Sequence, residues 1–348
     1  MRLLILTQKV DANDDVLGFM HGWIAEFAKN YELVTAICLE KGEANLPDNV
    51  KVLSLGKEAG CSKIKYIYNF YRYIWSERKN YDKIFVHMNQ EYILLGGIFW
   101  KFWRKRIGLW YAHGSIPFSL RIAEKMSDII FTSTQSGFRL KSGKKRVVGQ
   151  GIDISKFKPS LKHHNNDFFN IVTVGRISPV KDYETLIRAI EILAKENLKI
   201  KANIIGGAGR KSQEEYLESL KRMVSRKGLS GIIKFLGSIP NKDIVDYLQF
   251  SDLFANMSYT GSLDKAILEA MACGLPILTC NEALEEVLAN YRETLMYKKS
   301  AHQELSEKIR FLIKMPKEKR RNTGDDLRSI VVNNHSLKGL IKKISDLL

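Results

Sequence analysis

Residues 171–182 read Ile-Val-Thr-Val-Gly-Arg-Ile-Ser-Pro-Val-Lys-Asp, and this stretch carries the clearest signal of the fold. Its apolar, β-branched beginning predicts a buried strand, the glycine a turn, and the residues from 182 onward a helix. This order places Arg176 and Lys181 on a loop above the carboxyl end of the strand, where open α/β sheets bind ligands. Two cations beside a helix N-terminus favour an anion. Two ordinary exposed basic side chains remain the alternative.

Similar signals continue on both sides of this stretch, and they alternate in the way typical of βα units on parallel sheets. The fold class predicted is therefore α/β. In the second half, we predict strands at 169–174, 201–205, 232–236, 253–256 and 276–279, with helices at 182–196, 213–226, 243–249 and 264–272. In the first half, we predict strands at 3–6, 33–39, 83–87 and 129–133.

The chain of 348 residues is long enough for two domains of ordinary size. A polar, proline-containing stretch at 158–167 interrupts the periodic pattern and is the expected linker. We therefore expect an N-terminal domain at 1–160 and a C-terminal domain at 167–335. The last segment, 336–348, contains an amphipathic helix that we expect to pack back towards the N-terminal domain.

The composition, with 45% hydrophobic and 27% charged residues, indicates a globular protein. The four cysteines show neither a C-x-x-C pair nor zinc spacing, which favours a reducing cytoplasm. The apolar stretch at 92–100 is short of the roughly 20 residues that span a bilayer, and the N-terminus has no signal-peptide pattern. A net charge of +17 predicts an anionic partner, either nucleic acid, a membrane surface or a phosphate-bearing substrate. A solvated basic surface is the alternative.

Further candidate site residues follow the other strands of the second half. Residues 204–209 form a glycine-rich turn that lets backbone approach a ligand, although a plain strand-to-helix turn explains it as well. In the segment 259–278, Ser262 is a plausible N-cap of a helix, Asp264 lies in its first turn, and Gly274 ends it. Glu269 falls mid-helix among apolar neighbours, where a carboxylate needs hydrogen-bond donors such as ribose hydroxyls.

Taken together, these motifs resemble the donor domain of the retaining family 4 glycosyltransferases, which have the GT-B fold. The resemblance covers residues 149 to about 280 and is weak over the first 148 residues. It implies two Rossmann-like domains that face a central cleft. The motifs that carry it are Gly175-Arg176 with Lys181, the glycines at 205–209, Phe235-Leu236-Gly237, Asp252, the segment 268–276 and the segment 149–159.

The resemblance also implies roles for individual residues. Arg176 and Lys181 would act in catalysis by contacting the donor diphosphate, and His113 would join them by facing the donor sugar. A structural role for His113 is the alternative. Glu269 would hold the ribose and the backbone near Phe235 the base, while Gly18 would approach the phosphates. The full set of expected donor-binding residues is Gly18, Gly175, Gly207, Phe235, Leu236, Ser262, Leu263, Asp264, Lys265 and Glu269.

One position departs from the family pattern. The family usually has a second glutamate eight positions before Glu269, and this chain has Gly261 there. Asp264 and Lys265 are candidates to compensate. A lysine in the first turn of a helix opposes the helix dipole, so an anion near Lys265 would explain its placement. A solvated surface lysine is the alternative.

The expected reaction is transfer of a hexose-type sugar from a UDP- or GDP-linked donor to a glycan or lipid-linked glycan, in cell-surface polysaccharide or glycolipid synthesis. The resemblance implies retention of the anomeric configuration. The candidate donor loops contain no D-x-D metal motif, so we expect a metal-independent enzyme without cofactors. The alternatives are a sugar-nucleotide epimerase of the same architecture, a catalytically silent partner subunit and a basic nucleic-acid-binding protein. Dispersed basic residues and the lack of recognition motifs count against nucleic acid.

The first half offers features suited to an acceptor. Two basic, aromatic stretches at 63–75 and 98–106 have a composition suited to a membrane interface, so we expect peripheral attachment to the inner face of the plasma membrane. A buried helix with a basic rim is the alternative, because an apolar stripe such as that of 63–75 is more often core. Candidate acceptor-binding residues are Asp11, Asp14 and Asp15 after the first strand, where helix capping is the alternative, and His87 at a strand end.

Overall fold

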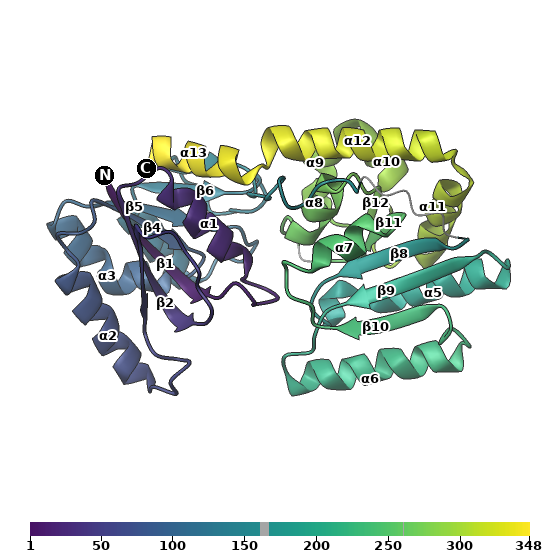
Figure 1. The fold of residues 1–348 in the computed structure, drawn as a ribbon, viewed down its shortest axis with the longest axis horizontal. Helices are drawn as coiled ribbons and strands as arrows, with labels where there is room; N and C mark the ends of the chain where they lie inside the picture. Colours follow the sequence, from purple (N-terminus) through teal and green to yellow (C-terminus); the bar gives the residue numbers. More distant parts are fainter. Residues whose placement is uncertain (161–166, 260) are drawn as a thin grey trace. The chain divides into compact units, whose positions relative to one another are not determined.

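The computed structural model describes residues 1–160, 167–259 and 261–348, and these form two compact units (Figure 1). Unit 1 comprises Met1–Gly151, Pro240–Lys242 and His335–Leu348, and unit 2 comprises Ile152–Ile239 and Asp243–Asn334. Most of the predicted linker, residues 161–166, lies outside the described residues. The change of unit falls at Gly151, so residues 152–160 belong with unit 2 and not with the N-terminal domain expected at 1–160.

Unit 1 contains a parallel sheet in the order β3-β2-β1-β4-β5-β6-β7. Successive residues of β1 point to opposite faces, so Leu3 and Ile5 join one apolar cluster while Leu4 and Leu6 join another. A strand buried on both faces reads as a continuous apolar run, as this one does. The strands are β1 (Arg2–Val10), β2 (Leu33–Lys41), β3 (Val50–Ser54), β4 (Lys83–His87), β5 (Arg106–Trp110), β6 (Ile129–Thr132) and β7 (Lys145–Val147).

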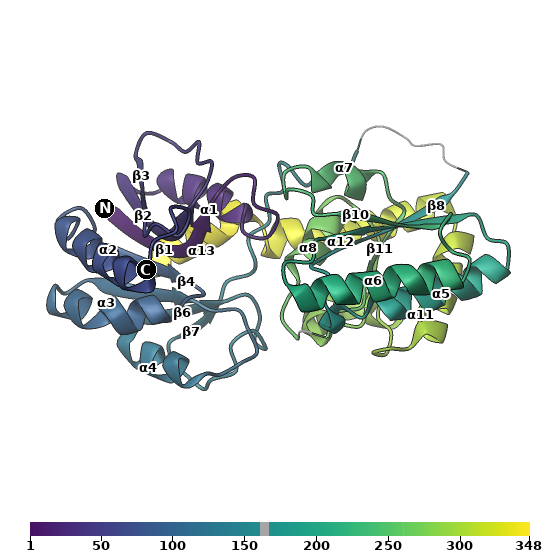
Figure 2. The same cartoon turned by 90° about the horizontal axis from the view of Figure 1, so that it is seen from below.

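Helices cover both faces of this sheet (Figure 2). On one face lie α1 (Phe19–Ala28) and the C-terminal helix α13 (Leu337–Leu347), which share a cluster that includes Trp23, Leu340 and Ile344. The indole N–H of Trp23 also donates to the carbonyl of Gly151 at 3.3 Å. The other face is covered by α2 (Lys63–Ser76), α3 (Glu91–Phe102) and α4 (Phe118–Met126).

Unit 2 contains a second parallel sheet in the order β10-β9-β8-β11-β12. The chain enters at the central strand β8, moves outward through β9 and β10, and then returns to the other side of β8 with β11. The strand order therefore reverses between β8 and β11, and such a switch point is where open parallel sheets bind ligands. The strands are β8 (Phe169–Val174), β9 (Ile200–Ile205), β10 (Ile233–Gly237), β11 (Leu253–Asn256) and β12 (Ile277–Thr279).

The helices of unit 2 surround one large apolar cluster that contains both faces of the sheet. No helix in the described ranges of the chain is long and apolar enough to cross a membrane. The helices are α5 (Tyr183–Lys195), α6 (Lys211–Arg226), α7 (Ile244–Gln249), α8 (Lys265–Ala272), α9 (Glu285–Leu288), α10 (Arg292–Leu295), α11 (His302–Lys314) and α12 (Lys317–Asn334), with 3-10 turns η1 (Pro179–Lys181), η2 (Glu282–Leu284) and η3 (Ala289–Tyr291).

The α/β class predicted from the sequence is confirmed, one local prediction is wrong, and one alternative considered from the sequence does not hold. Ser262 is not the N-cap, because α8 begins at Lys265 with Asp264 as its N-cap, and the carbonyl of Ser262 accepts a hydrogen bond from Asn281 at 2.8 Å. The apolar stripe of 63–75 is not core along its length. Of its members, Ile74 is buried, whereas Ile64 is 80% exposed.

Candidate functional site

The candidate site lies at the carboxyl edge of the second sheet, beside its switch point. Loops leave this edge after Val174 of β8, Ile205 of β9 and Asn256 of β11. Most of the predicted donor-binding residues fall on these loops or on α8, which follows β11. Since parallel strands end together, residues far apart in the sequence are brought to one edge.

Backbone hydrogen bonds hold the loops of this edge together. The N–H of Gly175 donates to Ile205 at 2.9 Å, and the N–H of Ile177 donates to Gly207 at 3.0 Å. Gly206 has φ of +154° and donates to the carbonyl of Gly237 at 2.8 Å. A Cβ atom at Gly206 would lie 1.9 Å from the Gly175 carbonyl oxygen. The close approach of β8 and β9 at this edge therefore requires glycine at 206.

Replacing Gly206 with alanine is expected to lower the free energy of unfolding by about 2–4 kcal/mol, because the new methyl group must displace the Gly175 backbone and the residue keeps an unfavourable φ. Urea unfolding measures this change. The matched control is Gly209→Ala in the same loop, where a Cβ atom would have 3.8 Å to its nearest neighbour. Equal stability of the two variants would contradict the close approach.

Lys181 and Asp264 form an ion pair at the centre of the edge. The Lys181 ammonium lies 2.8 Å from the Asp264 carboxylate, although the two residues are 83 positions apart. The same carboxylate oxygen accepts a hydrogen bond from the side-chain amide of Asn256 at 3.1 Å. Both side chains of the pair are more than four-fifths buried. Asp264 therefore holds the cation of the β8 loop against the start of α8.

The backbone around Lys181 is fixed by two tyrosines. The buried Tyr183 donates its hydroxyl to the Gly175 carbonyl at 2.7 Å, and the N–H of Tyr259 donates to the Val180 carbonyl at 3.0 Å. The Tyr259 hydroxyl also contacts the Asp182 carboxylate. Burial and this contact raise the pKa of Tyr259 to about 12. These contacts tie the lysine loop to the end of β8 and to the loop after β11.

Glu269 is 2% exposed and lies one helical turn after Lys265 on α8. Its carboxylate is 3.8 Å from the Lys265 ammonium, whose side chain is 18% exposed. Burial lowers the pKa of Lys265, and the Glu269 carboxylate opposes this shift only in part. Lys265 is therefore not the solvated surface lysine considered from the sequence. The two pairs bring two cations and two carboxylates to the first turns of one short helix.

The other predicted donor residues lie around these pairs. Arg176 is exposed on the β8 loop, and Leu263 is buried in front of α8. Phe235 and Leu236 are half-buried on the edge strand β10 and pack against the core of unit 2. Asp252, part of the motif set, lies at the opposite edge of the sheet, where it accepts from the backbone N–H of Asn170 at 2.9 Å. Asp252 therefore has a structural position away from the candidate site.

In unit 1, the carboxylates of the loop after β1 contact neighbouring residues of the same segment. Asp14 accepts hydrogen bonds from the N–H groups of Val16 and Leu17 at 2.9 and 2.6 Å, and it pairs with Lys9 at 2.9 Å. Burial raises the pKa of Asp14, but the Leu17 N–H and Lys9 outweigh it, and the pKa is lowered overall. Asp11 is 3.5 Å from Lys9. These contacts are local, but they are not the helix capping considered from the sequence, because α1 receives no side-chain cap. Acceptor binding by Asp11 and Asp14 stays a prediction.

Gly18 precedes α1, whose first turn contains no acidic residue and receives no side-chain cap. A Cβ atom at Gly18 would lie 2.4 Å from the Asp14 carbonyl oxygen, so the loop geometry itself requires glycine. Asp15 is exposed in the same loop. The N–H groups of Met20 and His21 in the first turn of α1 donate to the carbonyls of Leu17 and Gly18, and the approach of Gly18 to the phosphates stays a prediction.

The two candidate histidines of unit 1 differ in environment. His87 is buried at the end of β4, and its ring packs edge-on against Phe19 and Trp23, each at 5.7 Å. His113 is exposed, and its Nδ1 accepts a hydrogen bond from the backbone N–H of Ser115 at 3.1 Å. Because Nδ1 accepts this hydrogen bond, the tautomer that fits carries its proton on Nε2. His113 thus has an Nε2–H that can donate a hydrogen bond, whereas the ring of His87 packs among aromatic side chains. The predicted roles of both histidines stay predictions.

Sequence reasoning missed four polar residues that position the site: Asn256, Tyr183, Tyr259 and Asn281. Asn256 and Asn281 stand directly at or after apolar strands, a signal that could have been used. The tyrosines gave no such signal, because their roles depend on contacts with other loops. In the described parts of the chain, no group of three or more His, Cys, Asp or Glu side chains is arranged to hold a metal ion.

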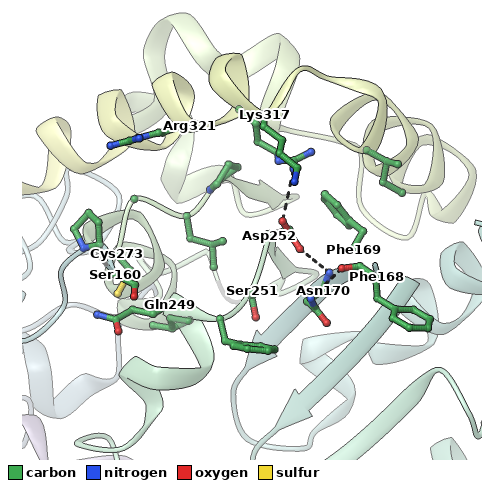
Figure 3. A pocket seen from close by; sticks show the side chains of 18 of the residues that line it. Ser160, Phe168, Phe169, Asn170, Gln249, Ser251, Asp252, Cys273, Lys317 and Arg321 are labelled. Atoms are coloured by element: carbon green, nitrogen blue, oxygen red, sulfur yellow. Dashed lines mark hydrogen bonds and ion pairs between the residues drawn. The ribbon is translucent and has the colours of Figure 1, made fainter. Parts of the chain in front are cut away.

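A cavity of about 950 Å³ opens at the amino edge of the second sheet, away from the candidate site (Figure 3). Asp252 and Asn170 lie next to each other in its lining, and a dashed line in Figure 3 marks the hydrogen bond between them. Arg320 lies 3.6 Å from the Asp252 carboxylate and stacks on Phe169 at 5.1 Å. These contacts join α12 to the sheet. The lining also includes residues on either side of 161–166, which are outside the described ranges, and we assign no ligand to this cavity.

Comparison with known structures places this architecture in a class. The structure of Anabaena HepE in complex with UDP and glucose superimposes with a TM-score of 0.78 at 19% identity, covering 99% of this chain and 98% of that one. A sucrose-phosphate synthase from Thermosynechococcus elongatus gives a TM-score of 0.78 at 16% identity, covering 100% and 98%. Two Rossmann-like units of this kind define the GT-B class of glycosyltransferases.

The family model for glycosyl transferases group 1 matches residues 154–329, about half of the chain, and the protein belongs to this family. Among curated relatives, the D-inositol 3-phosphate glycosyltransferase of Corynebacterium jeikeium is 28% identical over 47% of this chain and 44% of its own length. D-inositol 3-phosphate glycosyltransferase 2 of Catenulispora acidiphila is 26% identical over 39% of this chain and 34% of its own length. The chain therefore spans less than half the length of these relatives. The resemblance found from the motifs is confirmed.

Proposed function

We propose that this glycosyltransferase moves a hexose-type sugar from a UDP- or GDP-linked donor to a hydroxyl of a glycan or lipid-linked glycan, with retention of the anomeric configuration. The expected setting is cell-surface polysaccharide or glycolipid synthesis. A lipid-linked acceptor requires access to a membrane, so the proposal includes a cytoplasmic protein with peripheral attachment to the inner face of the plasma membrane.

The observation that carries the proposal is that the Lys181–Asp264 pair and the Lys265–Glu269 pair both lie at the start of α8, which follows β11 at the switch point of the second sheet. Cations beside the N-termini of α5 and α8 suit a diphosphate, since side-chain charge adds to that of the backbone N–H groups. A buried carboxylate suits the paired hydroxyls of a ribose. HepE, whose fold this chain shares, was crystallised with UDP and glucose, which supports a nucleotide-sugar donor.

In the proposed reaction, the bond between the sugar C1 and the diphosphate oxygen breaks, and a bond from the acceptor oxygen to C1 forms on the same face. The proton of the acceptor hydroxyl goes to the departing diphosphate. Negative charge grows on that diphosphate, and placing Arg176 and Lys181 beside it lowers the barrier. These cations do the work that a divalent ion does in other enzymes, and we therefore propose that no metal is required.

The free protein holds Lys181 against Asp264, so the diphosphate must compete with this carboxylate. The side-chain amide of Asn256 also donates to Asp264, and it would keep a partner for this carboxylate when Lys181 turns away. In unit 1, the backbone at Gly18 would approach the phosphates, and the Nε2–H of His113 would donate to a sugar hydroxyl. We retain these two roles as part of the proposal.

A thermal-shift panel of nucleoside diphosphates and their sugars, with and without EDTA, tests the proposal. One UDP- or GDP-based ligand at 100 times its Kd is expected to stabilise the protein by about 2.7 kcal/mol. EDTA is expected to leave both this shift and the transfer rate unchanged. No shift with any nucleotide would contradict the donor assignment, and loss of transfer in EDTA would contradict metal independence.

Two further observations separate the proposal from its alternatives. Incubation with donor alone should leave the sugar configuration unchanged, with at most slow hydrolysis, whereas an epimerase would convert the donor. Transfer by the purified chain should depend on Lys181. If the chain is a catalytically silent partner subunit, the purified chain would transfer no sugar, and replacing Lys181 would change nothing.

A further inference from the structure

We propose that an exposed aromatic face on α2 and α3 of unit 1 docks on an anionic lipid surface. The face consists of seven large apolar side chains, and their exposed fractions run from 37% for Phe99 to 82% for Phe102. This inference deepens the lipid-linked branch of the proposed function, and it can be tested without a donor. The members of the aromatic face are Ile64, Ile67, Tyr68, Trp75, Ile98, Phe99 and Phe102.

Side-chain contacts join α2 and α3 in the middle of the aromatic face and near the ends of the two helices. The hydroxyl of Tyr71 donates to the Leu95 carbonyl at 3.3 Å, and its ring lies 5.7 Å from that of Phe99. Trp75 of α2 lies 5.5 Å from Trp103, which follows α3. An apolar groove of about 470 Å³ runs between Tyr68, Trp75 and Phe99. Such a patch on a folded domain marks an interaction surface.

The cations of this surface are placed beside the aromatic rings. The ammonium of Lys65 lies 4.9 Å from the Tyr68 ring, and the guanidinium of Arg78 lies 5.2 Å from the Trp75 ring. Arg72 lies one turn from Tyr68 and lines the groove. Lys63, Lys65, Arg72, Arg78, Lys79 and Arg104 have no carboxylate within 4 Å in the described parts of the chain.

Charge and shape together favour a lipid surface over a protein partner. Exposed aromatic side chains bury at the level of the lipid headgroups, while long cationic side chains reach the phosphates beside them. Each Lys or Arg near an anionic bilayer makes the free energy of membrane binding more favourable, and this electrostatic contribution falls strongly as the salt concentration rises. The acidic neighbours do not cancel this charge, because Glu77 pairs with Lys51 and Asp82 pairs with Arg2.

The aromatic face and α1 lie on opposite sides of the sheet of unit 1. The helices α2 and α3 cover the sheet face of unit 1 that is opposite α1 and α13 (Figure 2). When α2 and α3 contact the lipid, α1 therefore lies on the side of the unit 1 sheet that does not touch the lipid. The arrangement would hold the acceptor-binding unit at the surface where a lipid-linked acceptor resides.

Vesicle co-sedimentation of the full chain tests this proposal. We expect binding to vesicles of phosphatidylcholine with about one third phosphatidylglycerol, and weak binding to phosphatidylcholine alone. The double variant Ile64→Ser, Phe102→Ser should bind at least about tenfold more weakly. The double variant Arg72→Gln, Lys79→Gln should bind roughly thirtyfold more weakly at low salt.

Matched controls lie elsewhere on the surface. Phe311→Ser removes a side chain that is 51% exposed on α11, and Lys338→Gln with Lys342→Gln removes two exposed cations from α13. Both controls should keep vesicle binding, and every variant should keep the thermal shift with the donor nucleotide. A nucleotide shift without vesicle binding overturns this inference and leaves the donor assignment intact. The inference is also overturned if light scattering shows a dimer that the face variants dissolve, because a second copy then covers the face.

Discussion

Replacing Lys181 with alanine is expected to slow sugar transfer by about 10²- to 10³-fold, the usual effect of removing one group that stabilises developing negative charge. The reason is that the Lys181 ammonium lies at the switch point of the second sheet, beside the N-terminus of α5, where the leaving diphosphate would gain charge. Transfer at saturating donor measures the effect. Arg176→Ala should act in the same direction.

The matched control is Arg188→Ala, which removes an exposed cation from α5 and should leave transfer unchanged. Lys181→Ala also leaves Asp264 without its ion pair, so repulsion of the diphosphate by that carboxylate is a second cause of slow transfer. Adding Asp264→Asn to the variant removes this repulsion. Transfer that stays slow in the double variant supports direct stabilisation by Lys181, and full recovery would contradict it.

Replacing Glu269 with alanine is expected to raise the KM for the donor by about 10- to 100-fold, since hydrogen bonds from ribose hydroxyls to a charged acceptor are lost. Glu269→Gln should have an intermediate effect because the amide still accepts one bond. The measurement is the donor KM with acceptor saturating. An unchanged KM in the folded alanine variant would be incompatible with ribose binding at this position.

Stability must be separated from binding in this experiment. Glu269→Ala removes a buried carboxylate 3.8 Å from the largely buried Lys265 ammonium, and breaking a fully buried pair costs up to about 3–5 kcal/mol. The double variant Lys265→Met, Glu269→Leu replaces the pair with apolar side chains and should recover much of that stability. If donor binding stays weak in this stable variant, the loss belongs to the site and not to the fold.

The second sheet could be predicted from the sequence because its strands are continuous apolar runs. The predicted strands at 169–174 and 253–256 match β8 and β11, and the others differ by a residue or so at their ends. In the first sheet, β3 at Val50–Ser54, β5 at Arg106–Trp110 and β7 at Lys145–Val147 were missed. Their apolar runs are short or are interrupted by cations, so tertiary pairing and not local pattern makes them strands.

The candidate site could be predicted only in outline. Motif order identified Lys181 and Glu269, because both lie at fixed places in strand–turn–helix units. The partners of these residues depend on which strand lies beside which, and one sequence does not encode that order locally. The pairing of Lys181 with Asp264 and the support from Asn256 are contacts of this kind. The exposure of Ile64 and Phe102 likewise follows from which faces of α2 and α3 pack on the sheet.

A crystal structure with the nucleoside diphosphate that gives the largest thermal shift tests the donor assignment most directly. The account predicts that the Lys181 ammonium leaves Asp264 and lies within hydrogen-bond distance of the diphosphate, while the Glu269 carboxylate accepts the ribose hydroxyls. A nucleotide bound in the cavity at the amino edge of the second sheet, with Lys181 still paired to Asp264, would contradict it.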